Sequence, residues 1–488
     1  MTEDRSKQAG ILTTAEFIRF GFKTIIGIAL ARILLPVELG SYRQLFLIYS
    51  TFSTLLLLGI PQSILYFLPK LKHIDSKKEF ITHTVNLITL LAFIFALAIF
   101  LLRGFIANIF HNPQLNTLLV IFAVYPLFMF ITQIYSQIML GLKQPKKTAT
   151  FTLISVACDF VFILGTALIT RNLHYIVLGV MFSALLQWGY AQYNLGRYLT
   201  KVTFDPDYYK EIFQYALPLG LASIIGMLSV QLDKLVVSGF FTPAEYAIFS
   251  IGAVELPLIS ILNNSVNAIL LPHISSNPDQ IYTIYKASVR KNALIIFPLC
   301  ALGLIFAEPL ITLLYSSTYK ASAPIFQVYL INLPLRIATY GIIFMALKKT
   351  KYIMINSIIT LSMNLVLNIL LVKLIGMIGA AIATVIVSWF SVTIYLYWIK
   401  NSLKLNLREL FPLPAIGKTA LSVTISALLS LSVLWIFGKG WLFQILALLA
   451  FIICYFFTGK ALNAILPYDI QYIKQLLNQA KMKISGNR

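Results

Sequence analysis

Long apolar runs separated by short polar connections make up almost the whole chain. A run of about 20 apolar residues is long enough to cross the hydrocarbon core of a bilayer as a helix. A membrane β-barrel would instead show stretches of alternating hydrophobicity, which this sequence lacks. The pattern therefore predicts an all-α polytopic membrane protein with about 14 transmembrane helices. The predicted spans are 11–34, 42–66, 81–102, 115–140, 150–170, 175–195, 212–238, 244–270, 291–314, 323–346, 352–372, 375–399, 413–437 and 441–458.

Composition excludes the soluble classes of protein. The chain has 488 residues, of which 59% are hydrophobic and 11% are charged. A soluble domain is nearer half apolar and about one quarter charged. A chain of this length without transmembrane segments would form several soluble domains, and the composition rejects that reading.

The basic excess follows the predicted topology. The net charge is +21, and most of the 38 Lys and Arg residues fall in the connections on the same side of the membrane as the N-terminus. Cytoplasmic loops collect Lys and Arg, so both termini are expected in the cytoplasm. Nucleic-acid binding would need a basic patch on a soluble fold, and we expect no nucleic-acid partner.

No pattern for a metal or a nucleotide is present in the sequence. The three cysteines stand apart with no CxxC pair, and the five histidines make no HxxH or HExxH spacing. Gly417-Lys418-Thr419 resembles the end of a P-loop, but Pro412 stands where its first glycine belongs. We therefore expect no metal, no cofactor and no ATP site, which leaves H⁺ or Na⁺ as candidate coupling ions.

The sequence contains an internal repeat with a period of about 205 residues. Four pairs of short anchors occur in the same order in both copies, and each anchor alone is weak. They are Pro36 and Glu38 with Pro243 and Glu245, Leu68-Pro69 with Leu271-Pro272, Pro126-Leu127 with Pro334-Leu335, and Leu142-Lys143 with Leu347-Lys348.

The repeat predicts two six-helix lobes followed by two further helices. Six is an even number, so both lobes have the same orientation, related by an axis along the membrane normal. The predicted domains are an N-lobe at 1–205, a C-lobe at 206–410, and a C-terminal part at 411–488 that ends in an amphipathic cytoplasmic helix. Two pseudo-symmetric lobes around a midplane cleft are typical of transporters that alternate access, and an enzyme is not indicated.

Three charged residues lie on one face of the first predicted span. Glu16, Arg19 and Lys23 follow the i, i+3, i+7 spacing of a helix face. The side chain of Glu16 is expected to reach the membrane interface by snorkelling, and Arg19 has a similar option. Lys23 lies too deep in the span to reach the interface. The pair Arg19 and Lys23 is therefore expected to face a cavity. The corresponding positions of the second lobe are Ser223, Gly226 and Val230, so the charge is not an architectural feature of both lobes.

Five further charged residues inside predicted spans are candidate site residues. Asp233 and Lys234 are either a local ion pair or part of a site. Asp159 and Arg336 are either a structural pair or ligand groups. Glu255, with Asp159, is the candidate carboxylate for a proton- or sodium-coupled exporter. A desolvated Arg and Lys pair suits a phosphate or pyrophosphate, because Arg offers a bidentate fork and Lys a point charge.

Three segments resemble the polysaccharide and O-antigen flippases of the multidrug/oligosaccharidyl-lipid/polysaccharide exporter superfamily, whose members include the MATE transporters. Residues 40–69 (GSYRQLFLIYSTFSTLLLLGIPQSILYFLP) resemble the signature between the first and second helices of that family. Residues 307–332 (AEPLITLLYSSTYKASAPIFQVYLIN) and 346–352 (ALKKTKY) are similar to the segment before the tenth helix and to the basic loop after it.

The resemblance implies a flippase that moves an undecaprenyl-pyrophosphate-linked oligosaccharide across the bacterial inner membrane by alternating access. It also implies membrane lipids as partners, together with a polymerase or glycosyltransferases of the same pathway. Family cavities are basic and lined by the first, second, seventh and eighth helices. Arg19 and Lys23 match that expectation, but the only basic residue of the second helix, Arg43, is expected at the outer mouth.

Three alternatives remain open. A cation-coupled multidrug or metabolite antiporter of the same superfamily would depend on Glu255 or Asp159. A lipid II flippase would share nearly all of the expected substrate chemistry. A membrane-bound glycosyltransferase or ligase ranks last, because the outer connections are too short to carry its motifs.

Overall fold

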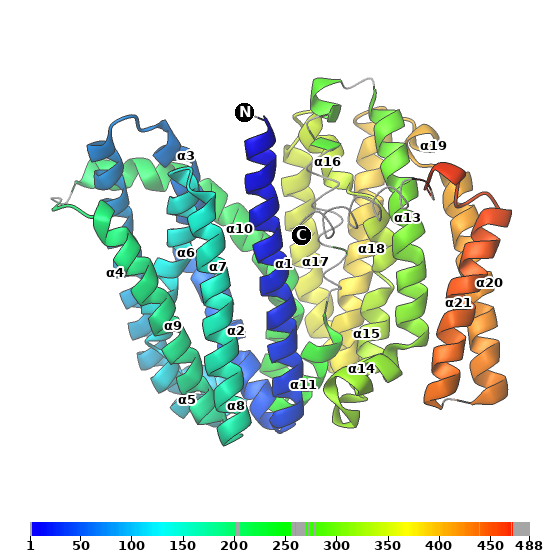
Figure 1. Ribbon diagram of the computed structural model, residues 1–488, viewed down its shortest axis with the longest axis horizontal. Coiled ribbons are helices and arrows are strands. Elements are labelled where there is room, and N and C mark those ends of the chain that lie inside the picture. The colour runs from blue at the N-terminus through cyan, green and yellow to red at the C-terminus, as the bar shows by residue number, and fades with distance from the viewer. Residues whose placement is uncertain are drawn as a thin grey trace, which may run out of the picture. The chain divides into compact units, whose positions relative to one another are not determined.

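The computed structural model of the protein describes residues 2–201, 205–254, 259, 270–271, 273–277, 280–438, 440–469 and 471. Every regular element within these ranges is a helix (Figure 1). The all-α prediction is therefore confirmed.

Ten helices in the described residues are long and apolar enough to cross a membrane, and the number rises to 12 when each of two bent helix pairs counts as one span. Two further predicted spans stand outside this count. The first is α1 (Thr2–Ile33), whose apolar part carries Glu16, Arg19 and Lys23. The second is 244–270, most of which lies outside the described residues. The expected polytopic fold is thus confirmed. Some helices, such as Ile74–Ile109 and Pro206–Phe240, extend past both ends of their predicted apolar runs.

The chain divides into two compact units. The first unit comprises Met1–Ile251, Ile311–Ser322 and Asn364–Ala380, and the second comprises Gly252–Leu310, Ala323–Met363 and Ala381–Arg488. The domain boundaries at 205 and 410 that the repeat suggests stay a prediction.

The first unit contains α1 and ten further α-helices in chain order, with short connections between them. They are α2 (Pro36–Leu57), α3 (Ile60–Phe67), α4 (Ile74–Ile109), α5 (Gln114–Phe122), α6 (Tyr125–Gly141), α7 (Pro145–Asp159), α8 (Gly165–Thr170), α9 (Leu173–Leu195), α10 (Pro206–Phe240) and α11 (Pro243–Gly252), the last reaching one residue past the unit. Three short helical turns join them, which are η1 (Leu68–Lys70), the π-helical η2 (Phe160–Leu164) and η3 (Gly196–Tyr198).

The remaining helices belong mainly to the second unit, and some cross its boundaries. They are α13 (Ile281–Ile305), α14 (Ala307–Tyr315), η5 (Ser317–Tyr319), α15 (Ser322–Leu330), η6 (Leu333–Ile337), α16 (Tyr340–Ala346), α17 (Lys351–Ile375), α18 (Met377–Asn401), α19 (Leu407–Leu410), α20 (Leu413–Phe437) and α21 (Trp441–Ala461). The last two, α20 and α21, pack against each other as a hairpin (Figure 1).

Helix α13 begins ten residues before its predicted span, so Arg290 lies inside a helix and not in a loop. The guanidinium donates to both carboxylate oxygens of Asp469, at 3.0 and 2.6 Å, and to the carbonyl of Ala464 at 3.2 Å. Because the charge is neutralised and hydrogen-bonded by these partners, the arginine is tolerated in a buried position. The segment after α21 is thereby attached to α13.

Two anchors of the sequence repeat adopt the same local geometry in both copies. Glu38 accepts the backbone N–H of Leu35 at 3.1 Å, and Glu245 accepts that of Thr242 at 2.9 Å. These are equivalent caps at the starts of α2 and α11, because the carboxylate satisfies an otherwise free amide at the helix N-terminus.

The helix ends at the anchor pair Leu142-Lys143 and Leu347-Lys348 are also alike. Lys143 and Lys348 both adopt a left-handed conformation, with φ of 59° and 57°. In each copy, three successive backbone N–H groups donate to the last carbonyls of the preceding helix with the same spacing. This is the hydrogen-bond pattern of a Schellman-type ending, and it supports the repeat at the level of the backbone.

Helix α2 packs very closely against the start of α11, its equivalent in the repeat. A Cβ atom on Gly40 would lie 1.8 Å from the carbonyl oxygen of Pro243, so only glycine fits there. Further along, Gly59 at the bend between α2 and α3 has φ of +77° and lies against Gly220 of α10. The close approach of backbone at both points fixes α2 and α3 against α10 and α11.

We predict that Gly40→Ala strongly destabilises the first unit. The added methyl group overlaps the Pro243 backbone, and such overpacking costs about 1–3 kcal/mol or more. The melting temperature of the purified protein in detergent should fall by several degrees. The matched control is Gly226→Ala in α10, where a Cβ meets nothing within 4 Å and a small stabilisation is expected. Equal melting temperatures for the two variants would show that the α2–α11 approach is not as close as described.

Candidate binding cavity

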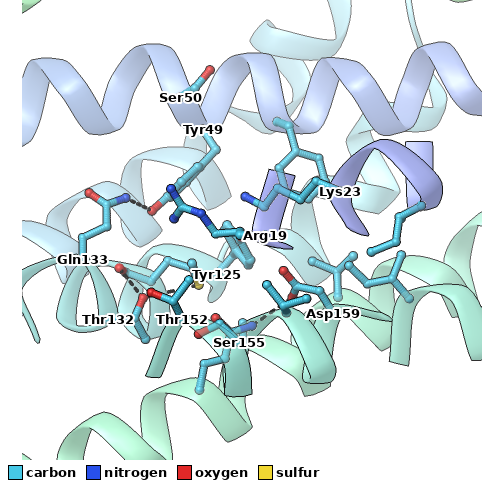
Figure 2. A pocket seen from close by; sticks show the side chains of 18 of the residues that line it. Arg19, Lys23, Tyr49, Ser50, Tyr125, Thr132, Gln133, Thr152, Ser155 and Asp159 are labelled. Carbon is cyan, nitrogen blue, oxygen red and sulfur yellow. Dashed lines mark hydrogen bonds between the residues drawn. The ribbon is translucent and has the colours of Figure 1, made fainter. Parts of the chain in front are cut away.

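A cavity of about 1040 Å³ lies within the first unit. Its wall consists of residues from α1, α2, α3, α6, α7, η2, α9, α10 and α11. The charged side chains that line it are Glu16, Arg19, Lys23, Arg43, Asp159 and Lys234. In Figure 2, Arg19 and Lys23 lie between Tyr49 and Ser50 on one side and Thr132, Thr152, Ser155 and Asp159 on the other.

Helix α1 carries the first three charges into the cavity because it packs along α7 and η2. Phe22 of α1 meets Phe160 of η2 edge to face, with ring centroids 5.0 Å apart. Arg19 and Glu16 form an ion pair one turn apart, and their side chains are 46% and 51% exposed. This pair therefore lies at the open part of the cavity.

Lys23 lies one turn further along α1 and lines the same cavity. No hydrogen bond or ion pair with its ammonium is present among the residues that the structure describes. Its electrostatic neighbours are Asp159, Arg19 and Glu16. The side chain is exposed to the cavity, and an ammonium without a direct partner in a membrane helix is available to a ligand.

Asp159 faces this part of the cavity from the end of α7. Its Oδ1 atom accepts hydrogen bonds from Ser183 Oγ at 2.7 Å and from Gln187 Nε2 at 2.9 Å, both on α9. The π-helical turn η2 begins at the next residue. Such turns interrupt the regular helix ladder and are frequent at functional sites. Asp159 is thus held by two neutral donors.

Arg43 of α2 also lines the cavity, and its Nη1 donates to Ser250 of α11 at 2.7 Å. The expected place of Arg43 at the outer mouth stays a prediction. Ser250 is the residue 207 positions later, which is its equivalent in the repeat. A guanidinium has five N–H donors, so donors remain for a ligand.

Asp233 and Lys234 have different surroundings. Lys234 lines the cavity, whereas Asp233 is buried and does not contribute to the described lining. The Asp233 carboxylate accepts the backbone N–H of Lys234 at 2.7 Å. The contact between these two residues is therefore a local backbone hydrogen bond.

The other two predicted site residues lie outside the described part of the first unit. Arg336 lies in η6 of the second unit and is absent from the described lining. Glu255 lies outside the described residues. The structure thus gathers five of the predicted residues, namely Glu16, Arg19, Lys23, Asp159 and Lys234.

Charge-based reasoning missed the neutral polar part of the wall. On α7, Thr148, Thr152 and Ser155 continue to Asp159 at i, i+4, i+7 and i+11, which is one helix face. This spacing was visible in the sequence and could have indicated the cavity side of the helix. On α6, a matching set comprises Thr132, Gln133, Ser136 and Gln137.

The lining has four basic and two acidic side chains, so its net formal charge is positive. The Asp159 carboxylate is already satisfied by neutral donors, and Lys23 and Lys234 have no ion-pair partner in the described part of the chain. A site of this charge attracts anions, and Arg and Lys are the side chains suited to phosphate groups.

Comparison with known proteins gives a family match. A model of the family described as polysaccharide biosynthesis protein matches residues 29–324. The capsular polysaccharide biosynthesis protein CapF of Staphylococcus aureus is 25% identical over 209 residues, which is 40% of this chain and 50% of that relative.

Two solved transporter structures share the fold. A lipid II flippase, MurJ, in an inward closed conformation superposes with a TM-score of 0.77 at 18% identity, covering 92% of this chain and 98% of that one. A multidrug resistance MATE family transporter of the MOP superfamily, in an inward-facing conformation, gives 0.64 at 14% identity, covering 78% and 93%. The expected MATE-like membrane fold is thereby confirmed.

We predict that Asp159→Asn folds normally and that Asp159→Leu does not. The asparagine Oδ1 can accept the same two hydrogen bonds from Ser183 and Gln187, whereas leucine leaves both donors buried and unsatisfied at about 1–3 kcal/mol each. Thermal unfolding in detergent should show a near-normal melting temperature for the first variant and a clear decrease for the second. Equal losses in both would mean that the charge of Asp159, and not its hydrogen bonds, maintains the wall.

Proposed function

Because the chain belongs to the polysaccharide biosynthesis protein family, we propose that it is a flippase for a lipid-linked oligosaccharide. The substrate is an undecaprenyl pyrophosphate that carries a glycan for a cell-surface polysaccharide. The chain is a multi-pass membrane protein with the fold of MOP superfamily transporters. In this proposal it lies in the bacterial inner membrane with both termini in the cytoplasm.

The observation that carries the proposal is the net basic cavity in the first unit. A pyrophosphate is a compact anion with several acceptor oxygens, and it is bound best by positively charged hydrogen-bond donors. Arg19 and Lys23 supply them from one face of α1, and Arg43 supplies further donors from α2. A site for a cationic drug would need the opposite charge, because like charges repel.

The proposed mechanism is alternating access by rocking of two lobes. The pyrophosphate binds Arg19 and Lys23, the glycan occupies the aqueous cavity, and the isoprenoid chain stays in the surrounding lipid. The binding is non-covalent, so no catalytic residue and no bound cofactor are needed. Transport is driven by a gradient of H⁺ or Na⁺ or by removal of the product. A polymerase or glycosyltransferases of the same pathway are the proposed partners.

A lipid II flippase is the second candidate function. The structural likeness to the lipid II flippase MurJ supports it, because the shared fold can house the same type of headgroup. Lipid II also presents a saccharide on an undecaprenyl pyrophosphate, so the basic cavity fits both substrates. The family match favours a polysaccharide precursor.

We predict that the double variant Arg19→Gln, Lys23→Gln loses flipping of the lipid-linked oligosaccharide. Removing both cations takes away the charge-assisted hydrogen bonds to the pyrophosphate, and a decrease of about 100-fold or more in binding is expected. Binding is measured in nanodiscs and flipping in proteoliposomes. The matched control is Lys72→Gln, Lys146→Gln, which removes the same charge from exposed positions outside the described lining. Full transport by the cavity variant, with the control unchanged, would end the proposal.

A ligand comparison separates the candidate functions. The purified protein should be thermally stabilised by an undecaprenyl-pyrophosphate oligosaccharide, less so at high salt, because salt screens the charge interactions. Stabilisation by lipid II alone would favour the second candidate. Stabilisation by cationic aromatic drugs, and by neither lipid, would contradict both flippase assignments and favour a cation-coupled antiporter.

A further inference from the structure

Two helices form a neutral, hydrogen-bonding wall beside the basic residues of the cavity. Helix α6 presents Thr132, Gln133, Ser136 and Gln137, which recur at i, i+1, i+4 and i+5 and therefore share one side of the helix. Helix α7 presents Thr148, Thr152 and Ser155 on one face. Thr132, Thr152 and Ser155 lie below Arg19 in Figure 2, on the side opposite Ser50. We call these seven residues the α6–α7 wall.

Part of the hydrogen-bonding capacity of this wall is unused. In the described part of the chain, the Gln137 amide and the Ser136 and Ser155 hydroxyls make no hydrogen bond through their side chains. The Gln137 Oε1 and Ser155 Oγ atoms are shielded from solvent as well. A buried polar atom without a partner costs about 1–3 kcal/mol, and nearly all such atoms in folded proteins are paired. A bound ligand with polar groups would satisfy them after a small side-chain adjustment.

The rest of the wall is held in place by protein contacts. Thr132 Oγ1 donates to the Met129 carbonyl at 2.8 Å, and Thr152 Oγ1 donates to the Thr148 carbonyl at 3.0 Å, so both hydroxyl oxygens still accept. Gln133 Nε2 donates to the Tyr49 hydroxyl at 2.8 Å, which leaves its carbonyl oxygen as an acceptor. The wall is thus positioned before any ligand binds.

Aromatic rings border the same region. Tyr49, Tyr125 and Phe151 all line the cavity. Tyr125 stacks on Phe122, and Phe151 packs between Tyr135 and Tyr190, so the rings are fixed from behind. Sugar rings have apolar C–H faces and a rim of hydroxyl groups that both donate and accept. The three rings are largely buried, and they add a small apolar surface beside the amides and hydroxyls, which matches that pattern.

From these contacts we propose that the α6–α7 wall is a saccharide-binding site, which recognises the first sugars of the lipid-linked substrate. This inference rests on the proposed function and adds to it the part of the protein that selects the glycan. The cavity volume of about 1040 Å³ is at the upper end of the roughly 300–1,000 Å³ typical of small-molecule sites. It can therefore hold a pyrophosphate on α1 and sugar rings on α6 and α7 at the same time.

The test is the triple variant Ser136→Ala, Gln137→Met, Ser155→Ala. These side chains make no hydrogen bond to described residues, so their removal leaves no protein donor or acceptor unpaired and the fold should persist. The matched control is Gln192→Met, Ser223→Ala, two residues outside the described lining. Folding of all variants is checked by melting temperature in detergent.

The probes are bare undecaprenyl pyrophosphate and three undecaprenyl pyrophosphates that carry N-acetylglucosamine, glucose or galactose, all in nanodiscs. The wild type should bind at least one glycosylated probe more tightly than the bare lipid. The triple variant should lose this difference in affinity, which is about ten-fold or more for three hydrogen bonds. It should bind the bare lipid as tightly as the wild type does. The double variant Arg19→Gln, Lys23→Gln should weaken every probe.

Two results would overturn the saccharide site. One is a wild type that binds bare and glycosylated lipids equally, and the other is a triple variant that retains the difference or weakens all probes alike. If no lipid binds the wild type, the proposed function fails, and binding of the corresponding free oligosaccharides then decides the site. If the wild type binds a free oligosaccharide and the triple variant does not, the wall is still a saccharide site, but for another function. If the wild type binds no free oligosaccharide, the saccharide site is rejected.

Discussion

Charged groups inside a membrane-spanning bundle must meet water, a counter-charge or a ligand, and the first unit is arranged around this constraint. An Arg or Lys at the centre of a spanning helix costs about 2.5–3.5 kcal/mol on insertion scales. Helix α1 carries Arg19 and Lys23, and both side chains line the cavity. The polar residues of α6, α7 and α9 surround the same space. Their positions follow from the need to keep these charges out of hydrocarbon.

Bent helices and glycine contacts give the cavity its wall. The axis bends by 47° between α2 and α3 and by 51° between α5 and α6. Gly59 at the first bend allows the backbone of α10 to approach. Gly40, near the start of α2, allows the start of α11 to approach in the same way. These approaches bring Arg43 against Ser250 and place Gln231 and Lys234 in the lining. Backbone packing therefore positions the side chains of α2, α10 and α11.

In the proposed function, the cavity combines two kinds of recognition. The cations of α1 and α2 provide strong but unselective attraction for phosphate. The neutral groups of α6 and α7 are weaker individually, and their selectivity depends on geometry, because each hydrogen bond needs a correctly placed partner. A transporter benefits from this division, since a ligand held only by several desolvated ion pairs would be released slowly. The two sets lie on different helices and can vary independently.

Much of the architecture was determined by the sequence alone, because the bilayer requires about 20 apolar residues for each span. A charged residue within such a span is therefore easy to recognise. The helical fold follows from the length of the apolar runs, and the repeat around Glu38 and Lys143 follows from anchors about 205 residues apart. The shared face of Glu16, Arg19 and Lys23 follows from their spacing along one helix. Only the tertiary structure decided that Asp159 accepts hydrogen bonds from Ser183 and Gln187, and that Arg43 lines the cavity beside Ser250. These relations depend on contacts between helices far apart in the chain, and the hydropathy of one helix does not determine which neighbour it packs against.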